Sequence, residues 1–143
     1  MVQIIIINGP NLNLLGIRQP EIYGTKSFDS YFIELENDFP EYNLHYYQSN
    51  HEGDIIDKIH GVGYRYDGII LNAGGFTHTS IAIADALLAI TTPVIEVHLT
   101  NIYEREAYRH TNYIKASAIH SIVGKGLAGY KEAIEYLKNH VIK

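Results

Sequence analysis

The sequence predicts a single α/β domain built on a five-stranded parallel sheet. Five short β-like runs alternate with segments whose apolar residues recur at helical spacing, which is typical of strand–helix–strand units with right-handed crossovers. Continuous apolar runs such as Gln3–Ile7 indicate strands that are covered on both faces. The chain has 143 residues, 46% of them hydrophobic, so we expect one domain spanning residues 1–143 with a core of its own.

The expected strands are short, and the first and third are uninterrupted apolar runs. Pro93 marks the start of the fourth. In chain order, the expected strands are Gln3–Ile7, Leu44–Tyr47, Gly68–Leu71, Val94–Val97 and Ile119–Val123.

Helical periodicity fills the segments between the strands. Ser27 is the expected N-cap of the first helix, in which apolar residues from Phe28 to Phe39 recur at helical spacing before Pro40 ends it. The remaining expected helices cover Ile55–Ile59 (ending near Gly61), Ile81–Leu88, Glu104–His110 and Leu127–Val141.

Five strands connected in this way favour the flavodoxin-like order 2-1-3-4-5 of a doubly wound sheet, with a switch point between the first and third strands. Ligands of such sheets bind beyond the carboxyl ends of the strands. The loops after Ile7, Leu71 and Val97 are therefore expected to carry the chemistry.

Composition limits the classes of function. With no cysteine, the chain can form no disulfide, thiolate metal site or cysteine nucleophile. A net charge of −5 without a Lys/Arg cluster argues against nucleic-acid binding. Met1–Ile7 has the pattern of a strand rather than a signal peptide, and no apolar run approaches the length of a membrane span. We expect a cytoplasmic protein that binds no membrane.

The loop Asn8–Gly24 after the first strand has roughly seventeen residues, whereas such loops usually have about 2–6. Long loops in compact domains tend to be functional. Its Asn-Gly, Gly-Pro and Tyr-Gly pairs are equally ordinary turn signals, so the residues alone leave both interpretations open.

The loop Asn72–Ser80 after the third strand contains two adjacent glycines and leads into a helix. Glycines would let an anion or polyol approach the backbone near the helix N-terminus. Alternatively, Thr79 or Ser80 simply caps that helix, and the residues do not decide between the two.

Glu96 and His98 lie two residues apart at the carboxyl end of the fourth strand, so their side chains share one face. A carboxylate beside an imidazole orients the ring and favours its protonated form. The pair is therefore a candidate general acid or base.

Arg105 and Arg109 stand at i and i+4 of the expected short helix and can share one face of it. One of them could clamp a substrate carboxylate through two hydrogen bonds. Solvated pairs with Glu104 or Glu106 would explain the spacing equally well.

Other patterns are not expected to be functional. Gly124–Gly129 fits the G-x-G-x-x-G dinucleotide pattern, but it follows the last strand and lacks the later acidic residue, so we expect a tight turn. The eight histidines show no H-E-x-x-H spacing, and no metal is expected. No lysine lies in an apolar strand, which argues against Schiff-base chemistry.

Four ordered blocks, together with Gly124–Tyr130, cover nearly the whole chain and resemble type II 3-dehydroquinate dehydratase. The blocks are Asn8–Gly24, Gln48–Gly53, Asn72–Ser80 and Glu96–Arg109. The resemblance implies a flavodoxin-like fold with no metal or cofactor. It also implies conversion of 3-dehydroquinate to 3-dehydroshikimate and water by anti elimination through an enolate, a step of the shikimate pathway to chorismate and the aromatic amino acids. The implied assembly is a homo-dodecamer built from trimers.

The resemblance also implies catalytic roles. Tyr23 would remove the proton alpha to the ketone. A free phenol, with a pKa of about 10, is a weak base at neutral pH, so its anion needs stabilisation. Arg18 would supply that stabilisation, with Arg105 as a second cation. Asn11 would stabilise the enolate oxygen through a water molecule.

His98, oriented by Glu96, would protonate the departing hydroxyl. Arg109 and His78 would hold ring hydroxyls, and the Leu99 and Thr100 amides with the Thr100 hydroxyl would hold the carboxylate. The implied substrate-binding residues are Asn72, His78, Asp85, Leu99, Thr100, Arg105 and Arg109, with Asp85 reaching the site of a neighbouring subunit.

The chain departs from the family pattern in a few places. Thr100 keeps the hydroxyl of the usual serine, whereas His120 replaces a small residue and leaves the packing of the last strand open. None of the departures, which are Gln19, Ala73, Gly75, Thr100, Tyr103 and His120, removes a catalytic group.

Two other classes of function remain open from the sequence. The first is a non-catalytic flavodoxin-like domain that binds a small ligand, in which the pairing of Arg18 with Tyr23 would be incidental. The second is a nucleotide-dependent enzyme that uses Gly124–Gly129.

Overall fold

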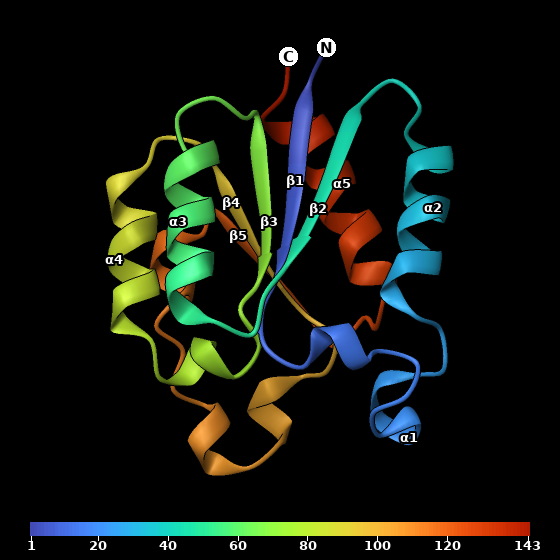
Figure 1. Ribbon diagram of the computed structural model, residues 1–143, viewed down its shortest axis with the longest axis vertical. Helices are drawn as coiled ribbons and strands as arrows, with labels where there is room; N and C mark the ends of the chain where they lie inside the picture. The colour runs from blue at the N-terminus through green and yellow to red at the C-terminus, as the bar shows by residue number, and fades with distance from the viewer.

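The computed structural model describes residues 1–143 and has three layers, with helices on both faces of a parallel sheet (Figure 1). The sheet order is β2-β1-β3-β4-β5, and all neighbouring strands are parallel. This confirms the predicted fold class and strand order. The strands are β1 (Gln3–Asn8), β2 (Asn43–Gln48), β3 (Gly68–Asn72), β4 (Val94–His98) and β5 (His120–Val123), each within one residue of its predicted bounds.

Four helices cover the sheet, two on each face (Figure 1). The side chain of Ser27 accepts a hydrogen bond from the Ser30 amide, which confirms the predicted N-cap. No helix is both long enough and apolar enough to cross a membrane. The helices are α2 (Phe28–Asp38) and α5 (Ala128–His140) on one face, and α3 (Glu52–Val62) and α4 (Ile81–Ala89) on the other.

The core has two halves, one on each face of the sheet. In β1, Ile4 and Ile6 belong to the half beneath α2 and α5, whereas Ile5 and Ile7 belong to the half beneath α3 and α4. All four side chains are essentially inaccessible to solvent. Alternate side chains of a strand point to opposite faces, so a strand covered on both faces is apolar throughout.

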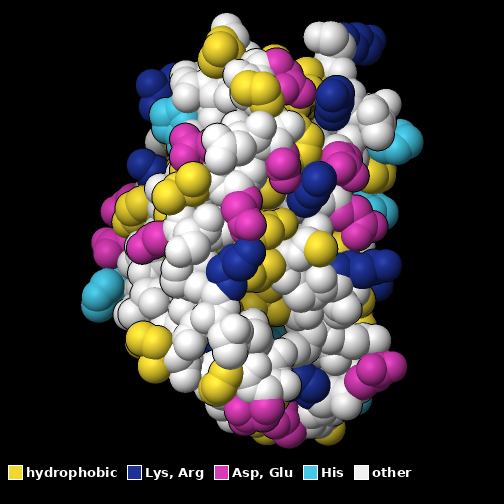
Figure 2. All heavy atoms as spheres, turned by 90° about the vertical axis from the view of Figure 1, so that its right-hand side faces the viewer, with side chains coloured by type: hydrophobic (Ala, Val, Ile, Leu, Met, Phe, Trp, Pro, Cys, Tyr) yellow, Lys and Arg dark blue, Asp and Glu magenta, His cyan; other side chains and the backbone are white.

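The face formed by α2 and α5 carries charges of both signs on its outside. Figure 2 shows that Lys and Arg side chains on this face are interspersed with Asp and Glu. Exposed ion pairs join Lys26 to Glu34 and Lys131 to Asp38. Since opposite charges alternate here, this face offers no concentrated positive field for a polyanion.

His120, on the edge strand β5, packs against Tyr136 of α5 and is not part of the buried core. Its ring stacks on that of Tyr136, with centroids 4.1 Å apart and planes 2° from parallel. The His140 ring lies on the same tyrosine, 4.4 Å away. The large residue in the last strand is therefore accommodated by a stack of aromatic rings at the surface.

The expected helix over Glu104–His110 is wrong. Two separate 3₁₀ turns, Ile102–Glu104 and Ala107–Arg109, occupy this region. Arg105, between them, is extended with φ −103° and ψ −161°, which interrupts any continuous helix. Arg105 and Arg109 therefore do not share a helix face.

The Gly124–Gly129 stretch turns the chain from β5 into α5. Gly124 and Gly126 have φ values of +75° and +60°, a region that glycine enters without steric cost. Their amides donate hydrogen bonds to the carbonyls of His98 and Leu99, over 3.2 Å and 2.9 Å. The turn thus fixes the backbone at the end of β4.

Candidate active site

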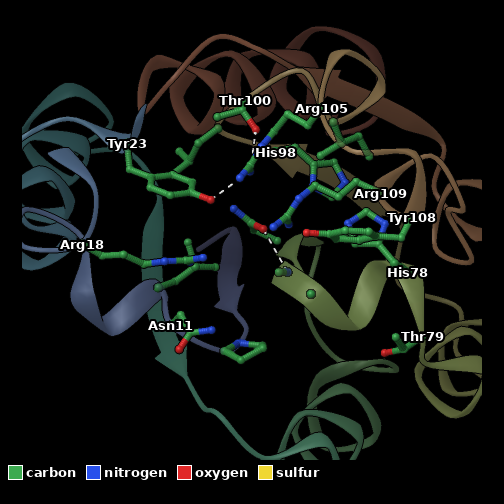
Figure 3. A pocket seen from close by; sticks show the side chains of 17 residues that line it. Asn11, Arg18, Tyr23, His78, Thr79, His98, Thr100, Arg105, Tyr108 and Arg109 are labelled. Atoms are coloured by element: carbon green, nitrogen blue, oxygen red, sulfur yellow. Dashed lines mark hydrogen bonds between the residues drawn. The ribbon is translucent and has the colours of Figure 1, made fainter. Parts of the chain in front are cut away.

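A cavity of about 390 Å³ opens beyond the carboxyl ends of β1, β3 and β4, where the fold predicted a ligand (Figure 3). All but two of the predicted site residues line it. Those that do are Asn11, Arg18, Tyr23, Asn72, His78, His98, Leu99, Thr100, Arg105 and Arg109.

Tyr23 ends the short helix α1 (Pro20–Tyr23) and points its hydroxyl into the cavity (Figure 3). The hydroxyl accepts a hydrogen bond from Nη1 of Arg105 over 2.9 Å. The guanidinium carbon of Arg18 lies 4.8 Å from the centre of the tyrosine ring. Two cations therefore act on this phenol, and the direct hydrogen bond comes from Arg105, which was expected to be the second cation.

The start of the loop is anchored to the neighbouring strands. The Gly9 amide donates to the Asn72 carbonyl over 2.8 Å, and a Cβ at Gly9 would lie 2.5 Å from the Ala73 oxygen, so only glycine permits this approach. Asn11 has φ +69°, which asparagine tolerates better than most residues. Its amide donates to the Asn50 side chain over 2.9 Å, leaving its own side chain free at the cavity (Figure 3).

Glu96 lies behind His98 and does not line the cavity. Its carboxylate is 1% exposed and lies 2.8 Å from Nε2 of His98. It also accepts hydrogen bonds from Asn112 over 2.8 Å and Ser121 over 2.7 Å. Burial by itself raises the pKa of the Glu96 carboxyl, but the hydrogen bonds from His98, Ser121 and Asn112 hold that pKa below its usual value.

An ionised Glu96 fixes the proton on His98. Because a carboxylate only accepts hydrogen bonds, Nε2 of His98 carries the proton that the 2.8 Å contact requires. Nδ1 makes no hydrogen bond with the protein and is the nitrogen available to a ligand in the cavity. The pair can therefore transfer a proton at Nδ1 while Glu96 compensates the charge of the ring.

His78 presents a nitrogen lone pair to the cavity. Its Nδ1 lies 2.7 Å from the Thr111 carbonyl, which can only accept, so Nδ1 carries the proton. Burial lowers the pKa of His78, and the nearby charge of Arg109 lowers it further. The ring is therefore neutral at pH 7, and Nε2 can accept a hydrogen bond from a ligand hydroxyl.

Arg109 both pairs with a glutamate at the surface and reaches the cavity, the two possibilities that the sequence left open. Its Nε donates to the Glu106 carboxylate, as a surface pair would, and its guanidinium lies 5.2 Å from the Tyr108 ring. The same side chain nevertheless lines the cavity (Figure 3). Because Glu106 is bound through Nε, the two terminal nitrogens of Arg109 remain free to donate hydrogen bonds to a ligand.

Two adjacent backbone amides at the end of β4 suit an anion. Leu99 and Thr100 line the cavity, and neither amide donates a hydrogen bond to a protein acceptor. The Thr100 hydroxyl lies beside them and accepts from Arg105 over 3.4 Å. Successive unpaired N–H groups form a positive concavity of the kind that binds carboxylates.

Asp85 is the other predicted residue that does not line the cavity. It lies on the exposed face of α4.

Some of the residues that line the cavity were not predicted from the sequence. They include Tyr108, which stands between Arg109 and His78 in Figure 3, and the apolar residues Leu12 and Ile102. No sequence signal separates Tyr108 from the other surface tyrosines. The chain brings together no cluster of three His, Asp or Glu side chains that could hold a metal ion.

Comparison with known proteins assigns a family to this fold and cavity. Residues 2–138 match the family model described as dehydroquinase class II. A 3-dehydroquinate dehydratase of Exiguobacterium sp. is 49% identical over 140 residues, which cover 97% of this chain and 96% of the relative. The catabolic 3-dehydroquinase 2 of Neosartorya fischeri is 45% identical over 148 residues, covering 99% and 96%.

Solved structures agree with the sequence comparison. The crystal structure of the type II dehydroquinase from Butyrivibrio crossotus superimposes with a TM-score of 0.90 at 43% identity, covering 96% of this chain and 98% of that one. Since both fold and sequence match along nearly their full lengths, the chain belongs to the class II dehydroquinase family.

Proposed function

We propose that this chain, as a single catalytic domain over residues 1–143, is a 3-dehydroquinate dehydratase of the hydro-lyase class. It removes water from 3-dehydroquinate by anti elimination through an enolate and yields 3-dehydroshikimate. The observation that carries the proposal is the phenol of Tyr23 in the cavity, hydrogen-bonded by Arg105 and covered by Arg18. A domain that only binds a ligand has no need for two cations on one phenol, whereas a tyrosine base does.

The first step is removal of the proton alpha to the ketone by the Tyr23 oxygen. The Arg105 guanidinium donates to this oxygen over 2.9 Å and the Arg18 charge lies over the ring, so both cations are placed to interact with the oxygen as it accepts the proton. The electron pair of the broken C–H bond moves onto the carbonyl oxygen. The Asn11 side chain, free at the cavity, stabilises this enolate oxygen through a water molecule.

The second step expels the hydroxyl. The enolate re-forms the ketone, the C–O bond breaks, and protonated His98 delivers a proton from Nδ1 so that water leaves. Glu96, 2.8 Å from Nε2, stabilises the imidazolium before this transfer. The cycle closes when the proton on Tyr23 returns to His98 through solvent.

The remaining groups match the polar parts of the substrate. The unpaired amides of Leu99 and Thr100, with the Thr100 hydroxyl, would hold the carboxylate. Nε2 of neutral His78 and the terminal nitrogens of Arg109 would hold ring hydroxyls. No metal or organic cofactor takes part in this scheme.

We also propose that the protein is cytoplasmic, that it assembles as a homo-dodecamer built from four trimers, and that it serves the shikimate pathway to the aromatic amino acids. Ile81 and Leu88, which are 58% and 72% exposed, flank Asp85 on the outer face of α4. A helix that is apolar on its outer side as well as its inner side is normally covered by another protein surface. We propose that a second copy of the chain covers α4, which would bring Asp85 to the active site of that neighbouring subunit. Light scattering should give the mass of a dodecamer, and a monomeric mass with full activity would contradict this assembly.

Absorbance tests the proposed reaction directly, because the product is a conjugated enone and the substrate is not. Mixing the purified protein with 3-dehydroquinate should produce a rise in ultraviolet absorbance that is proportional to enzyme concentration. If no rise occurs at high enzyme concentration, the chain is not a dehydratase. The binding-domain alternative would then be tested by measuring whether 3-dehydroquinate still binds.

A further inference from the structure

A buried hydroxyl links the ends of β1 and β3. Tyr130, on α5, is fully buried, and its hydroxyl donates to Oδ1 of Asn8 over 2.8 Å. The Tyr130 hydroxyl oxygen in turn accepts a hydrogen bond from Nδ2 of Asn72 over 3.0 Å. Both asparagines are buried at the carboxyl ends of their strands, and Asn72 forms part of the cavity wall.

The contacts around Asn72 fix which way its amide faces. Oδ1 of Asn72 accepts a hydrogen bond from the Gly74 amide over 3.1 Å. One Nδ2 hydrogen goes to Tyr130 over 3.0 Å, and the second Nδ2 hydrogen remains free to donate to a ligand. Asn72 can therefore present a donor N–H to the cavity.

The direction of the Tyr130 hydroxyl is fixed as well. Burial raises the pKa of this hydroxyl, so it keeps its proton at neutral pH. Asn8 Oδ1 can only accept, so the proton points toward Asn8 and the tyrosine lone pairs face Asn72. A reversed Asn72 amide would place its oxygen against these lone pairs and its NH₂ against the Gly74 amide.

We propose that Tyr130 is a positioning residue for the dehydratase, which holds the Asn72 amide so that its N–H is directed at an acceptor oxygen of the substrate. Asn8 takes part by holding the tyrosine proton. The inference rests on the proposed function for its assay, but its geometry does not depend on that function. Packing alone does not require the hydroxyl, because the Tyr130 ring already contacts Phe28 with centroids 4.9 Å apart.

The test compares Tyr130→Phe, which removes one oxygen atom, with Tyr136→Phe on the same helix. Tyr136 stacks on His120 and makes no contact with the cavity. With 3-dehydroquinate as substrate, Tyr130→Phe should raise KM about five- to tenfold, the effect of one lost neutral hydrogen bond, with kcat within about threefold of the wild type. Tyr136→Phe should leave both constants unchanged.

A double-mutant cycle separates positioning from a general structural effect. If Tyr130 acts through Asn72, then Asn72→Ala raises KM by itself and Tyr130→Phe adds nothing further in that background. Additive effects of the two substitutions would overturn the proposal. So would an unchanged KM in Tyr130→Phe.

Poor folding does not obscure the result, because KM is independent of the fraction of active protein. If Tyr130→Phe yields no folded protein, Asn8→Ala removes the acceptor of the tyrosine proton and leaves α5 intact. It should raise KM in the same range, and an unchanged KM would overturn the proposal. A wild type that turns over no substrate would refute the proposed function instead, which distinguishes the two failures.

Discussion

The hydroxyl of Tyr23 lies 2.9 Å from Nη1 of Arg105, although the two residues are 82 positions apart in the chain. Arg105 reaches it because the chain is extended between two 3₁₀ turns, not because of a helix. Arg18, five residues from Tyr23, lies over the ring instead. The base of the proposed reaction thus depends on a distant arginine for its direct contact.

Arg105→Met should lower kcat about 10- to 100-fold, because it removes a charged hydrogen bond to the proposed base while keeping most of the side-chain volume. Steady-state kinetics with 3-dehydroquinate measure the loss. Arg65→Met is a matched control, since the Arg65 guanidinium binds the Gly61 carbonyl away from the cavity. Equal kinetics for Arg105→Met and wild type would assign the stabilisation of Tyr23 to Arg18 alone.

Glu96 should make stability depend on pH. The pKa of this carboxyl is lowered in the folded chain, so the unfolded chain binds its proton more readily. Its contribution to the free energy of unfolding is complete above its unfolded pKa of about 4.3 and is lost as the pH falls through the lower folded pKa.

Urea denaturation of the wild type and of Glu96→Gln, from pH 7 down to pH 3, checks this dependence. The stability advantage of the wild type should shrink toward low pH. Glu132→Gln, an exposed position on α5, should show no such change. A constant difference between Glu96→Gln and wild type across this range would contradict the shifted pKa.

We expect substrate binding to weaken in acid because His78 becomes protonated. Its pKa is lowered by burial, so the ring is neutral at pH 7 and gains a proton on Nε2 only at more acidic pH. Since that proton removes the acceptor for a ring hydroxyl, KM should rise as the pH falls into the acidic range. In His78→Gln, KM should be higher at pH 7 and should lose that part of its pH dependence. A KM profile identical to that of the wild type would show that Nε2 does not bind the substrate.

Removal of metal ions should leave the activity intact, because every proposed step uses side chains of this chain. Incubation with EDTA followed by the absorbance assay measures this, and borohydride in the presence of substrate tests for an imine to lysine. Loss of activity with EDTA would indicate a required metal ion. Loss with borohydride would indicate a covalent lysine adduct.

The sequence was sufficient to predict the strand order of the sheet and most of the residues that line the cavity. Continuous apolar runs and their alternation with helices determine the strand order, and that order places the loops after β1, β3 and β4 together. The pairing of Glu96 with His98 follows from the two-residue period of a strand. The helix over Glu104–His110 was predicted wrongly because Asn101 accepts a hydrogen bond from the Tyr103 amide and starts a tighter turn.

Contacts between distant elements could not be read from spacing. Ser121 reaches Glu96 because β5 pairs with β4 in a register that sets the two residues side by side. Tyr130, in the first turn of α5, reaches Asn72 because α5 packs on one face of the sheet. Each contact depends on packing, and no local pattern in the sequence encodes the distance.

Tyr23→Phe tests the central claim most directly, since it removes the proposed base and one oxygen atom. The account predicts that kcat falls about 10²- to 10⁴-fold while the dissociation constant for 3-dehydroquinate stays near that of the wild type. Tyr42→Phe, which stacks on Phe39 outside the cavity, is the control and should be fully active. If Tyr23→Phe retains most of the wild-type kcat, Tyr23 is not the base and the proposed mechanism is wrong.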